Sequence, residues 1–317
     1  MLAQGISGTI RWTIDRDGVL CFIPVNGKEG TFADSDDNVN LNIHDGGYAW
    51  NKYYQHIERI KSKGIIHLAK DSSFMFYGCS FLKNINALKN WDTQDVKDVS
   101  SMFSDCTSLT NVDGLKNWNI QNVKWTSCMF YDCNSLSNIN GLKNWNTENV
   151  TFMGYMFHCC FGLTNLDGLK NWNTQKVTDM MSMFFGCSHL TNIDALKDWN
   201  TENVTDMSRM FYSCCSLTDI SVLKNWNIQN VTDMIDMFYE CFSLATVELS
   251  ETNKKFISEL PADKIPALSL KWHKVDSTQE YTPDEIVKNW NSSFKGVWSR
   301  EKVSKLQRMK EKLQLSC

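Results

Sequence analysis

A period of 27 residues runs through the middle of the chain and restricts its fold more than any other feature. Tryptophan recurs at this interval, at Trp91, Trp118, Trp145, Trp172, Trp199 and Trp226. Each tryptophan lies in a similar segment, such as LKNWNIQNV or LKNWNTENV. Strict self-similarity at such a period is typical of a solenoid, in which every repeat forms one coil.

Cysteine and large apolar residues follow the same period. The cysteine column is Cys79, Cys106, Cys133, Cys160, Cys187, Cys214 and Cys241, and Met-Phe pairs recur from Met75-Phe76 to Met237-Phe238. One repeat cannot bury its own apolar side, so neighbouring coils must stack and share a core. The sequence therefore predicts an α/β repeat solenoid over residues 66–249, right-handed, with about seven coils, each made of a short strand and a short helical turn.

The repeat over residues 203–229 shows how one coil is expected to be built. Thr205 is a candidate helix N-cap. Met207, Met210 and Phe211 then follow at helical spacing and face inward. Leu217–Ile220 is expected to form the short strand.

The flanks lack the period and are expected to form separate parts. Residues 1–65 form a β-rich cap with a hairpin at Asp17-Gly18, and residues 269–299 form a small C-terminal module. Residues 250–268 are expected to be a linker. Residues 300–317 form a basic amphipathic helical tail, through which the chain could form an oligomer.

The polar stretch 33–47 carries the spacing Asp34-x-Asp36-x-Asn38, which is typical of a calcium loop. It lacks the glycine that such loops need at the sixth position, and Asp45 replaces glutamate at the twelfth. A solvated loop is the favoured interpretation. The cysteines lack zinc-finger spacing, so no metal and no cofactor are expected.

Charge and hydropathy exclude two classes of protein. The formal net charge of -4 argues against a basic nucleic-acid-binding protein. No stretch reaches the 18 or so apolar residues of a transmembrane helix. The first residues, MLAQGISGTI, do not have the pattern of a signal peptide, so a cytoplasmic location stays open, as does a mature or truncated form.

The repeat text NVTDMSRMFYSCCSLTDI, flanked by WNTENV, resembles the BspA-like family of bacterial surface proteins, a divergent branch of the leucine-rich repeats first noted in mycoplasma lipoproteins. The segment SGTIRWTIDRDGVLCFIP is similar to the module that precedes such repeats. The string Trp272, Tyr281–Glu285 and Gly296–Trp298 is similar to the module that follows them. The resemblance implies a leucine-rich-repeat-like solenoid, a place at the cell surface or outside the cell, and adhesion to host proteins or other cells.

Two features of the repeat are candidate binding sites, and the first is an interruption of one column. Aspartate occupies one column at Asp98, Asp179, Asp206 and Asp233, but Trp125 and Phe152 replace it in two neighbouring coils. The sequence predicts an exposed partner-binding cluster made of Trp125, Tyr131, Phe152, Tyr155 and His158. In the alternative interpretation, Trp125 and Phe152 pack on each other or under a flank.

A lysine column is the second candidate. Its members are Lys89, Lys116, Lys143, Lys170, Lys197 and Lys224. They form either a positive strip for an anionic partner such as a sulfated glycan, or side chains that extend into solvent and pair with Asp113, Asp167 and Asp194.

These features favour a non-enzymatic binding or adhesion protein that presents a repetitive surface to a protein or glycan. An intracellular interaction scaffold or effector is the alternative. A glycan-active enzyme on a solenoid ranks lower, because no nucleophile and base are recognisable together and the histidines are scattered (His44, His56, His67, His158, His189 and His273). An ice-binding threonine face, built on Thr110, Thr164, Thr191 and Thr218, ranks lowest.

Overall fold

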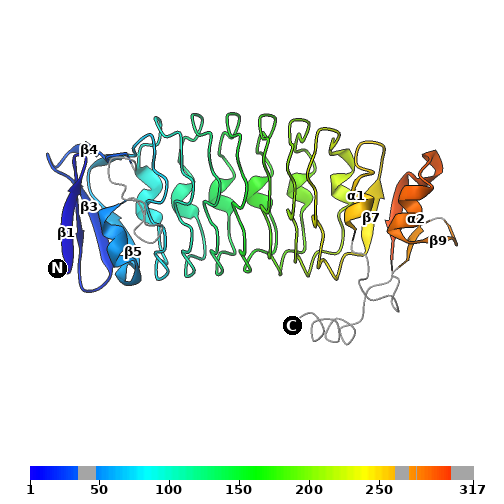
Figure 1. Ribbon diagram of the computed structural model, residues 1–317. Helices are drawn as coiled ribbons and strands as arrows, with labels where there is room; N and C mark the ends of the chain where they lie inside the picture. The colour runs from blue at the N-terminus through cyan, green and yellow to red at the C-terminus, as the bar shows by residue number, and fades with distance from the viewer. Residues whose placement is uncertain (35–47, 261–270, 276, 301–317) are drawn as a thin grey trace.

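The computed structural model describes residues 1–34, 48–260, 271–275 and 277–300. The repeats stack side by side into an elongated body, with a β-rich cap at the N-terminal end and a small β-containing module at the other end (Figure 1). The candidate calcium loop, apart from Asp34, lies outside the described residues. Residues 261–268 of the predicted linker and residues 301–317 of the predicted tail also lie outside them.

The N-terminal cap contains a sheet of four strands in the order β1-β2-β3-β5. The elements of this region are β1 (Ala3–Ser7), β2 (Ile10–Ile14), β3 (Val19–Pro24), β4 (Glu29–Thr31), the 3₁₀ helix η2 (Ala49–His56), β5 (Arg59–Ser62) and β6 (Ile65–His67). Strands β2 and β3 pair in antiparallel register, which confirms the hairpin predicted at Asp17-Gly18. Gly18 has a φ of 71°, and a Cβ atom there would lie 2.4 Å from the carbonyl oxygen of His56, so this turn requires glycine.

The cap passes directly into the first coil. Parallel bridges join Arg59 to Asn84 and His67 to Asp92. The ring of Phe22, in β3, lies 5.5 Å from the ring of Trp91 and 6.4 Å from that of Phe76. The cap therefore covers the apolar end of the stacked repeats, which would otherwise be exposed to water.

Backbone hydrogen bonds join each coil to the next. The N–H of Phe103 donates to the carbonyl of Met129 at 2.9 Å, and Phe184 donates to Met210 at 2.9 Å in the same way. Isolated parallel bridges join the coils in two further columns, one that runs from Asp71 to Asp233 and one that contains Asn111–Asn138, Asn165–Asn192 and Asp219–Thr246. The predicted strand Leu217–Ile220 is therefore reduced to one bridging residue, Asp219, which pairs with Thr246 of the next coil.

The predicted helix at the Met-Phe segment is wrong. Arg209 and Ser213 have φ values of 54° and 56°, in the left-handed region, and an α-helix cannot contain such residues. The N–H of Phe211 donates to Met237 in the next coil and not to its own turn. Met210 and Phe211 are nevertheless fully buried, so their inward orientation is confirmed.

The helical turns of the coils lie elsewhere, just before or at the tryptophan of each repeat. They are the 3₁₀ helices η3 (Asn86–Asn90), η4 (Asp113–Leu115), η5 (Asn140–Leu142), η6 (Asp167–Leu169), η7 (Asp194–Leu196) and η8 (Ser221–Asn225). From Trp118 onward, the indole Nε1 of each tryptophan donates to a leucine carbonyl of the preceding coil, as Trp145 does to Leu115 at 3.1 Å, whereas Trp91 donates to the hydroxyl of Ser62 at 3.1 Å. This bond satisfies a buried donor that would otherwise destabilise the core.

Like side chains stack on one another through the core. The phenylalanine rings at Phe103, Phe130 and Phe157 are nearly parallel, with centroids 5.8 and 5.5 Å apart. The thiol of Cys133 is fully buried and donates to the carbonyl of Phe103 at 3.1 Å. The cysteines of the column from Cys79 to Cys241 are thiols in this structure.

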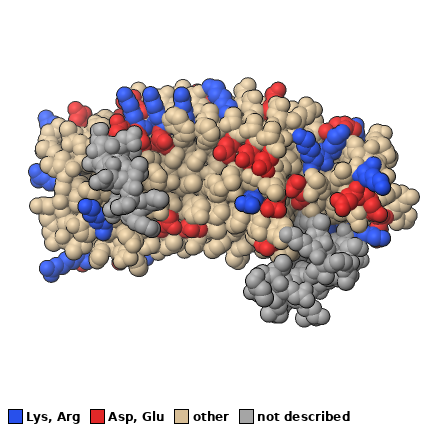
Figure 2. Space-filling view, viewed as in Figure 1, with Lys and Arg blue, Asp and Glu red and all other residues tan. Residues whose placement is uncertain are grey.

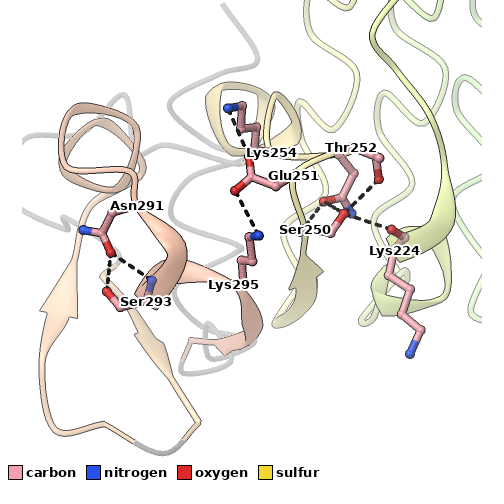
Figure 3. A network of polar contacts seen from close by, with 9 residues as sticks. Lys224, Ser250, Glu251, Thr252, Lys254, Asn291, Ser293 and Lys295 are labelled. Atoms are coloured by element: carbon pink, nitrogen blue, oxygen red, sulfur yellow. Dashed lines mark hydrogen bonds and ion pairs between the residues drawn. The ribbon is translucent and has the colours of Figure 1, made fainter.

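The last coil and the C-terminal module share a sheet. Their elements are β7 (Thr246–Leu249), α1 (Phe256–Glu259), β8 (Trp272–Lys274), β9 (Glu280–Tyr281), α2 (Pro283–Lys288), the 3₁₀ helix η9 (Ser292–Phe294) and β10 (Gly296–Ser299). The strand order is β7-β10-β8-β9, and β7 also bridges the preceding coil. Polar contacts reinforce the junction, where Glu251 binds both Lys254 and Lys295 at 3.3 and 3.1 Å (Figure 3).

Two predicted boundaries at this end differ from the structure. The described part of the predicted linker, residues 250–260, is packed: Phe256 and Ile257 are buried, and the Phe256 ring meets Phe238 edge-on. Arg300 was predicted to begin the basic amphipathic tail, but its side chain is buried against the last coil and its Nε donates to the carbonyl of Leu244. Residues 250–260 and Arg300 cover the C-terminal end of the core, because stacked repeats leave apolar surface open there.

The tightly buried core leads us to expect a large loss of stability when a charge is placed in a central coil. Met183 is fully buried, and Met183→Asp should lower the free energy of unfolding by more than about 4 kcal/mol, because the carboxylate has no partner there. Urea unfolding followed by circular dichroism measures this. Lys170→Asp, at an exposed position, is the control and should cost less than about 0.5 kcal/mol. Equal stability of Met183→Asp and the wild type would contradict the stacked core.

Candidate partner-binding surface

Trp125 and Phe152 interrupt a column of aspartates that have a structural role. The column runs Asp71, Asp98, Trp125, Phe152, Asp179, Asp206 and Asp233, and parallel bridges join each member to the next. The aspartates accept a hydrogen bond from the backbone N–H two residues later, as Asp98 does from Ser100 at 2.7 Å and Asp206 from Ser208 at 2.8 Å. Such bonds stabilise a turn. Aromatic side chains cannot accept them, so two adjacent coils have given up a stabilising bond.

The two aromatic side chains remain substantially exposed at the surface. Trp125 is 38% exposed and Phe152 is 39% exposed, in a column whose neighbours need no apolar side chain. The Nζ of Lys124 lies 5.8 Å from the centre of the Trp125 ring, a cation–π contact. The structure thus presents two adjacent apolar rings at the surface, next to charged residues.

The other three predicted residues lie in a half-buried ladder of rings. His158 lies between Tyr131 and Phe185, with centroid distances of 4.5 and 4.4 Å and nearly parallel rings. The ring of Tyr155 lies 5.6 Å from His158. The expectation that these three rings are exposed is therefore only partly met, because Tyr131 and His158 stack face to face, Tyr155 leans on both, and all three side chains are half-buried.

A basic column that the sequence reasoning missed lies beside Trp125. Lys70, Lys97 and Lys124 immediately precede Asp71, Asp98 and Trp125, and all three lysines are exposed. Later coils carry threonine instead, at Thr151, Thr178, Thr205 and Thr232. The replacement of threonine by lysine in three consecutive repeats was the signal that could have revealed this column. Figure 2 shows basic side chains along one edge of this view toward the N-terminal end, and acidic side chains grouped further toward the C-terminal end.

The predicted lysine strip is exposed in all of its six members, from Lys89 to Lys224. The predicted ion pairs with Asp113, Asp167 and Asp194 are wrong: none of these carboxylates pairs with a lysine in the described ranges. Lys197 lies 3.8 Å from Asp198 and Lys224 lies 3.2 Å from Glu248. Asp194 instead accepts from the side-chain amide of Asn192 at 3.0 Å, because that amide is closer in the same turn.

The described residues offer little for covalent or metal chemistry. No group of three or more histidine, cysteine or acidic side chains is placed to hold a metal ion among residues 1–34, 48–260, 271–275 and 277–300. Burial raises the pKa of the ladder thiols, such as Cys106 and Cys160, well above the ordinary value for cysteine. A thiol with a raised pKa is a poor nucleophile at neutral pH.

A family model described as "Mycoplasma protein of unknown function, DUF285" matches residues 51–162 and 160–258. The chain belongs to this family. The matched stretches of DUF285 run from η2 to α1 and include both Trp125 and Phe152. No curated protein matches the chain.

Solved structures of two leucine-rich repeat proteins are similar to this DUF285 chain at low identity. A leucine-rich repeat protein from Eubacterium ventriosum is 12% identical, with a TM-score of 0.24, covering 75% of this chain and 94% of its own. A leucine rich cell surface protein from Faecalibacterium prausnitzii is 13% identical, with a TM-score of 0.21, covering 84% and 99%. In the described part of the chain, no helix is both long and apolar enough to cross a membrane.

The ring ladder predicts a dependence of stability on pH. Burial lowers the pKa of His158 from an ordinary value near 6.5 to about 4. Between these values the unfolded chain binds a proton that the folded chain does not, so folding stability should fall as the pH drops from 6.5 toward 4. His158→Phe, which matches Phe185 in the next coil, should flatten this part of the profile.

Melting temperatures measured from pH 4 to 7 test this dependence. His189→Phe is the control, since His189 is exposed and bonds at the surface to the carbonyl of Phe161. An unchanged slope in His158→Phe would contradict the assignment of the neutral imidazole to the ladder.

Proposed function

We propose that the protein is a non-enzymatic binding protein whose surface around Trp125 and Phe152 engages a protein or glycan partner. The observation that supports this most is the pair of exposed rings that replace turn-stabilising aspartates in adjacent coils. Tryptophan is enriched among the residues that dominate binding energy at interfaces. A feature that lowers local stability and exposes apolar area is best explained by what it binds.

Adhesion at a cell surface or outside the cell is the proposed setting. It rests on the resemblance of the repeat text to the BspA-like surface proteins. An intracellular interaction scaffold or effector is the alternative, and it would use the same surface. The proposal takes the chain as a right-handed, leucine-rich-repeat-like solenoid of seven coils, supported by the seven members of the bridged column from Asp71 to Asp233.

The aromatic pair gives the direct test of binding. Trp125→Ala with Phe152→Ala should remove at least about nine-tenths of partner capture, since losing one hot-spot side chain costs more than about 2 kcal/mol. The melting temperature should change little, because both rings are substantially exposed. The wild-type protein and the variant are compared on surface-biotinylated host-cell proteins and on a glycan array.

The matched control is Phe81→Ala with Phe161→Ala. These rings are 48% and 40% exposed but lie in other columns. The proposal fails if this control loses binding equally, or if the Trp125/Phe152 variant unfolds early while its folded fraction still binds.

The lysine strip, defined by Lys89, Lys116, Lys143, Lys170, Lys197 and Lys224, is proposed as a contact for an anionic partner such as a sulfated glycan. Lys116→Gln, Lys143→Gln and Lys170→Gln together should weaken retention on immobilised heparin. Wild-type retention should fall steeply between 0.05 and about 0.3 M salt, because exposed charges are screened. Retention that does not change with salt, or no retention at all, would remove the strip from the proposal.

A further inference from the structure

The bridged column that contains Trp125 and Phe152 has aspartates on both sides of the two rings, but these aspartates have different neighbours. A lysine immediately precedes each of the first three members of the column, at Lys70, Lys97 and Lys124. Threonine immediately precedes each of the last four, at Thr151, Thr178, Thr205 and Thr232. The chain therefore places its own cations beside the carboxylates on the N-terminal side and uncharged hydroxyls beside those on the C-terminal side. We call the C-terminal carboxylates, Asp179, Asp206 and Asp233, the acidic end of the surface.

The carboxylates of the acidic end are not neutralised by ion pairs with the described residues. Within residues 1–34, 48–260, 271–275 and 277–300, no lysine or arginine pairs with any of the three. The nearby Arg209 pairs with Asp236, at 3.5 Å. Partial burial, together with the neighbouring carboxylate of Asp206, raises the pKa of Asp179. A cation that approached the acidic end would therefore stabilise its charged form.

The exposed rings adjoin the acidic end directly. Phe152 and Asp179 are joined by a parallel bridge, so they lie about 5 Å apart along the stack. The face of an aromatic ring attracts a cation, as the contact of Lys124 with Trp125 at 5.8 Å already shows in this chain. In the next coil the residue that corresponds to Lys124 is Thr151. A cation from outside the chain can therefore contact the Phe152 ring and the Asp179 carboxylate together.

We propose that this surface binds a segment of a partner protein in which apolar side chains are followed by lysine or arginine. The apolar side chains pack on Trp125 and Phe152, and the cations contact the acidic end. Charge complementarity selects this partner, because an anionic glycan at the same place would meet carboxylates. The inference rests on the proposed function, since it names the class of partner that the same two rings bind.

The spacing of the column fits side chains on one face of a helix. Four steps of the column separate Trp125 from Asp233, about 19 Å at the usual spacing of paired strands. Helix positions i, i+4, i+7, i+11 and i+14 lie on one face and span about 21 Å. A helix can thus place two apolar and three cationic side chains against the five members from Trp125 to Asp233. The cationic end must lie away from Lys70 and Lys97, which fixes the direction of the helix.

The probe is a fluorescent alanine- and glutamine-rich peptide of about 21 residues, long enough to contain all five positions on one helix face. Leucine occupies the first two positions and arginine the last three. Fluorescence anisotropy measures its binding to the full chain at about 0.05 M salt, where charges are screened little. The arginine peptide should bind, and its affinity should fall as salt is added. A peptide with glutamate in place of arginine should bind at least about ten-fold more weakly, because its charges then face carboxylates.

Neutralising the acidic end tests where the cations bind. Asp179→Asn, Asp206→Asn and Asp233→Asn together should weaken binding of the arginine peptide at least about ten-fold, because the attracting charges are removed. Asparagine is chosen because its side-chain oxygen can still accept the N–H that Asp179 accepts from Met181 at 2.8 Å. Circular dichroism confirms that the variant is folded.

The other end of the same column supplies the matched control. Asp71→Asn with Asp98→Asn removes carboxylates that already have lysines as sequence neighbours, so binding should change by less than about two-fold.

A second variant leaves every aspartate in place. Thr178→Lys with Thr205→Lys copies the Lys97-Asp98 pattern into the acidic end, at one half-buried and one exposed position. It should also weaken binding at least about ten-fold, because the added lysines repel the arginines of the peptide. If the asparagine variant does not fold, this variant decides the test.

The other outcomes separate this inference from the proposed function. If the arginine peptide does not bind while capture of host protein or glycan still depends on Trp125 and Phe152, the inference is overturned and the proposed function stands. Binding that neither variant of the acidic end weakens, or that the Asp71/Asp98 control weakens equally, also overturns the inference. Capture that does not depend on Trp125 and Phe152 removes the proposed function, and the inference with it.

The basic C-terminal segment of the chain is the other candidate occupant. Its cations are removed by Lys302→Gln, Lys305→Gln and Arg308→Gln. Peptide binding that appears only in this variant assigns the surface to the chain's own segment and overturns the inference of a partner protein. Equal binding by the variant and the wild type supports the partner.

Discussion

The backbone hydrogen bonds between Met-Phe segments of successive coils are the interaction on which the rest of the structure depends. They require two left-handed residues in each repeat, such as Ser101 and Asp105, with φ values of 54° and 61°. These residues turn alternate N–H groups toward the next coil, so that Ser101, Phe103 and Asp105 all donate across. For a residue other than glycine this conformation costs about 1 kcal/mol or more, which the bonds between coils must offset.

The same bonds fix the register between coils, and the register explains the composition. Residues 27 apart lie directly above one another, so a residue that fits one coil fits the next. Phenylalanine rings then stack on phenylalanine, and from Cys106 to Cys241 each thiol of the column donates to the carbonyl of a phenylalanine in the coil before it, as Cys187 does to Phe157 at 3.2 Å. The abundance of cysteine, methionine and tryptophan follows from this repetition, and it requires no catalytic or metal-binding role.

Periodicity alone was enough to predict the stacked repeats and the inward side of each coil, including Met183 and Cys187. It could not predict the local backbone, because serine, aspartate, arginine and cysteine all occupy left-handed positions and none of them marks such a turn in a sequence. For the candidate surface, the exposure of Trp125 and Phe152 agrees with the sequence, whereas His158 is half-buried. His158 stacks on a ring of the next coil, Phe185, and the identity of residue 158 alone does not predict this stacking.

Stacked repeats also allow a surface residue to be compared with the residues at the same position in the neighbouring coils. In the column that contains Trp125 and Phe152, the usual residue is an aspartate that accepts a backbone N–H. A coil with another residue at this position loses the stabilising bond, whereas the coils with aspartate keep it. Trp125 and Phe152 depart in adjacent coils, at the point where the neighbouring column changes from lysine to threonine. Because both columns change between the same two coils, the surface around Trp125 and Phe152 has a centre and two ends of different composition. A uniform surface can bind at any register, whereas a surface with a centre and a direction can select one.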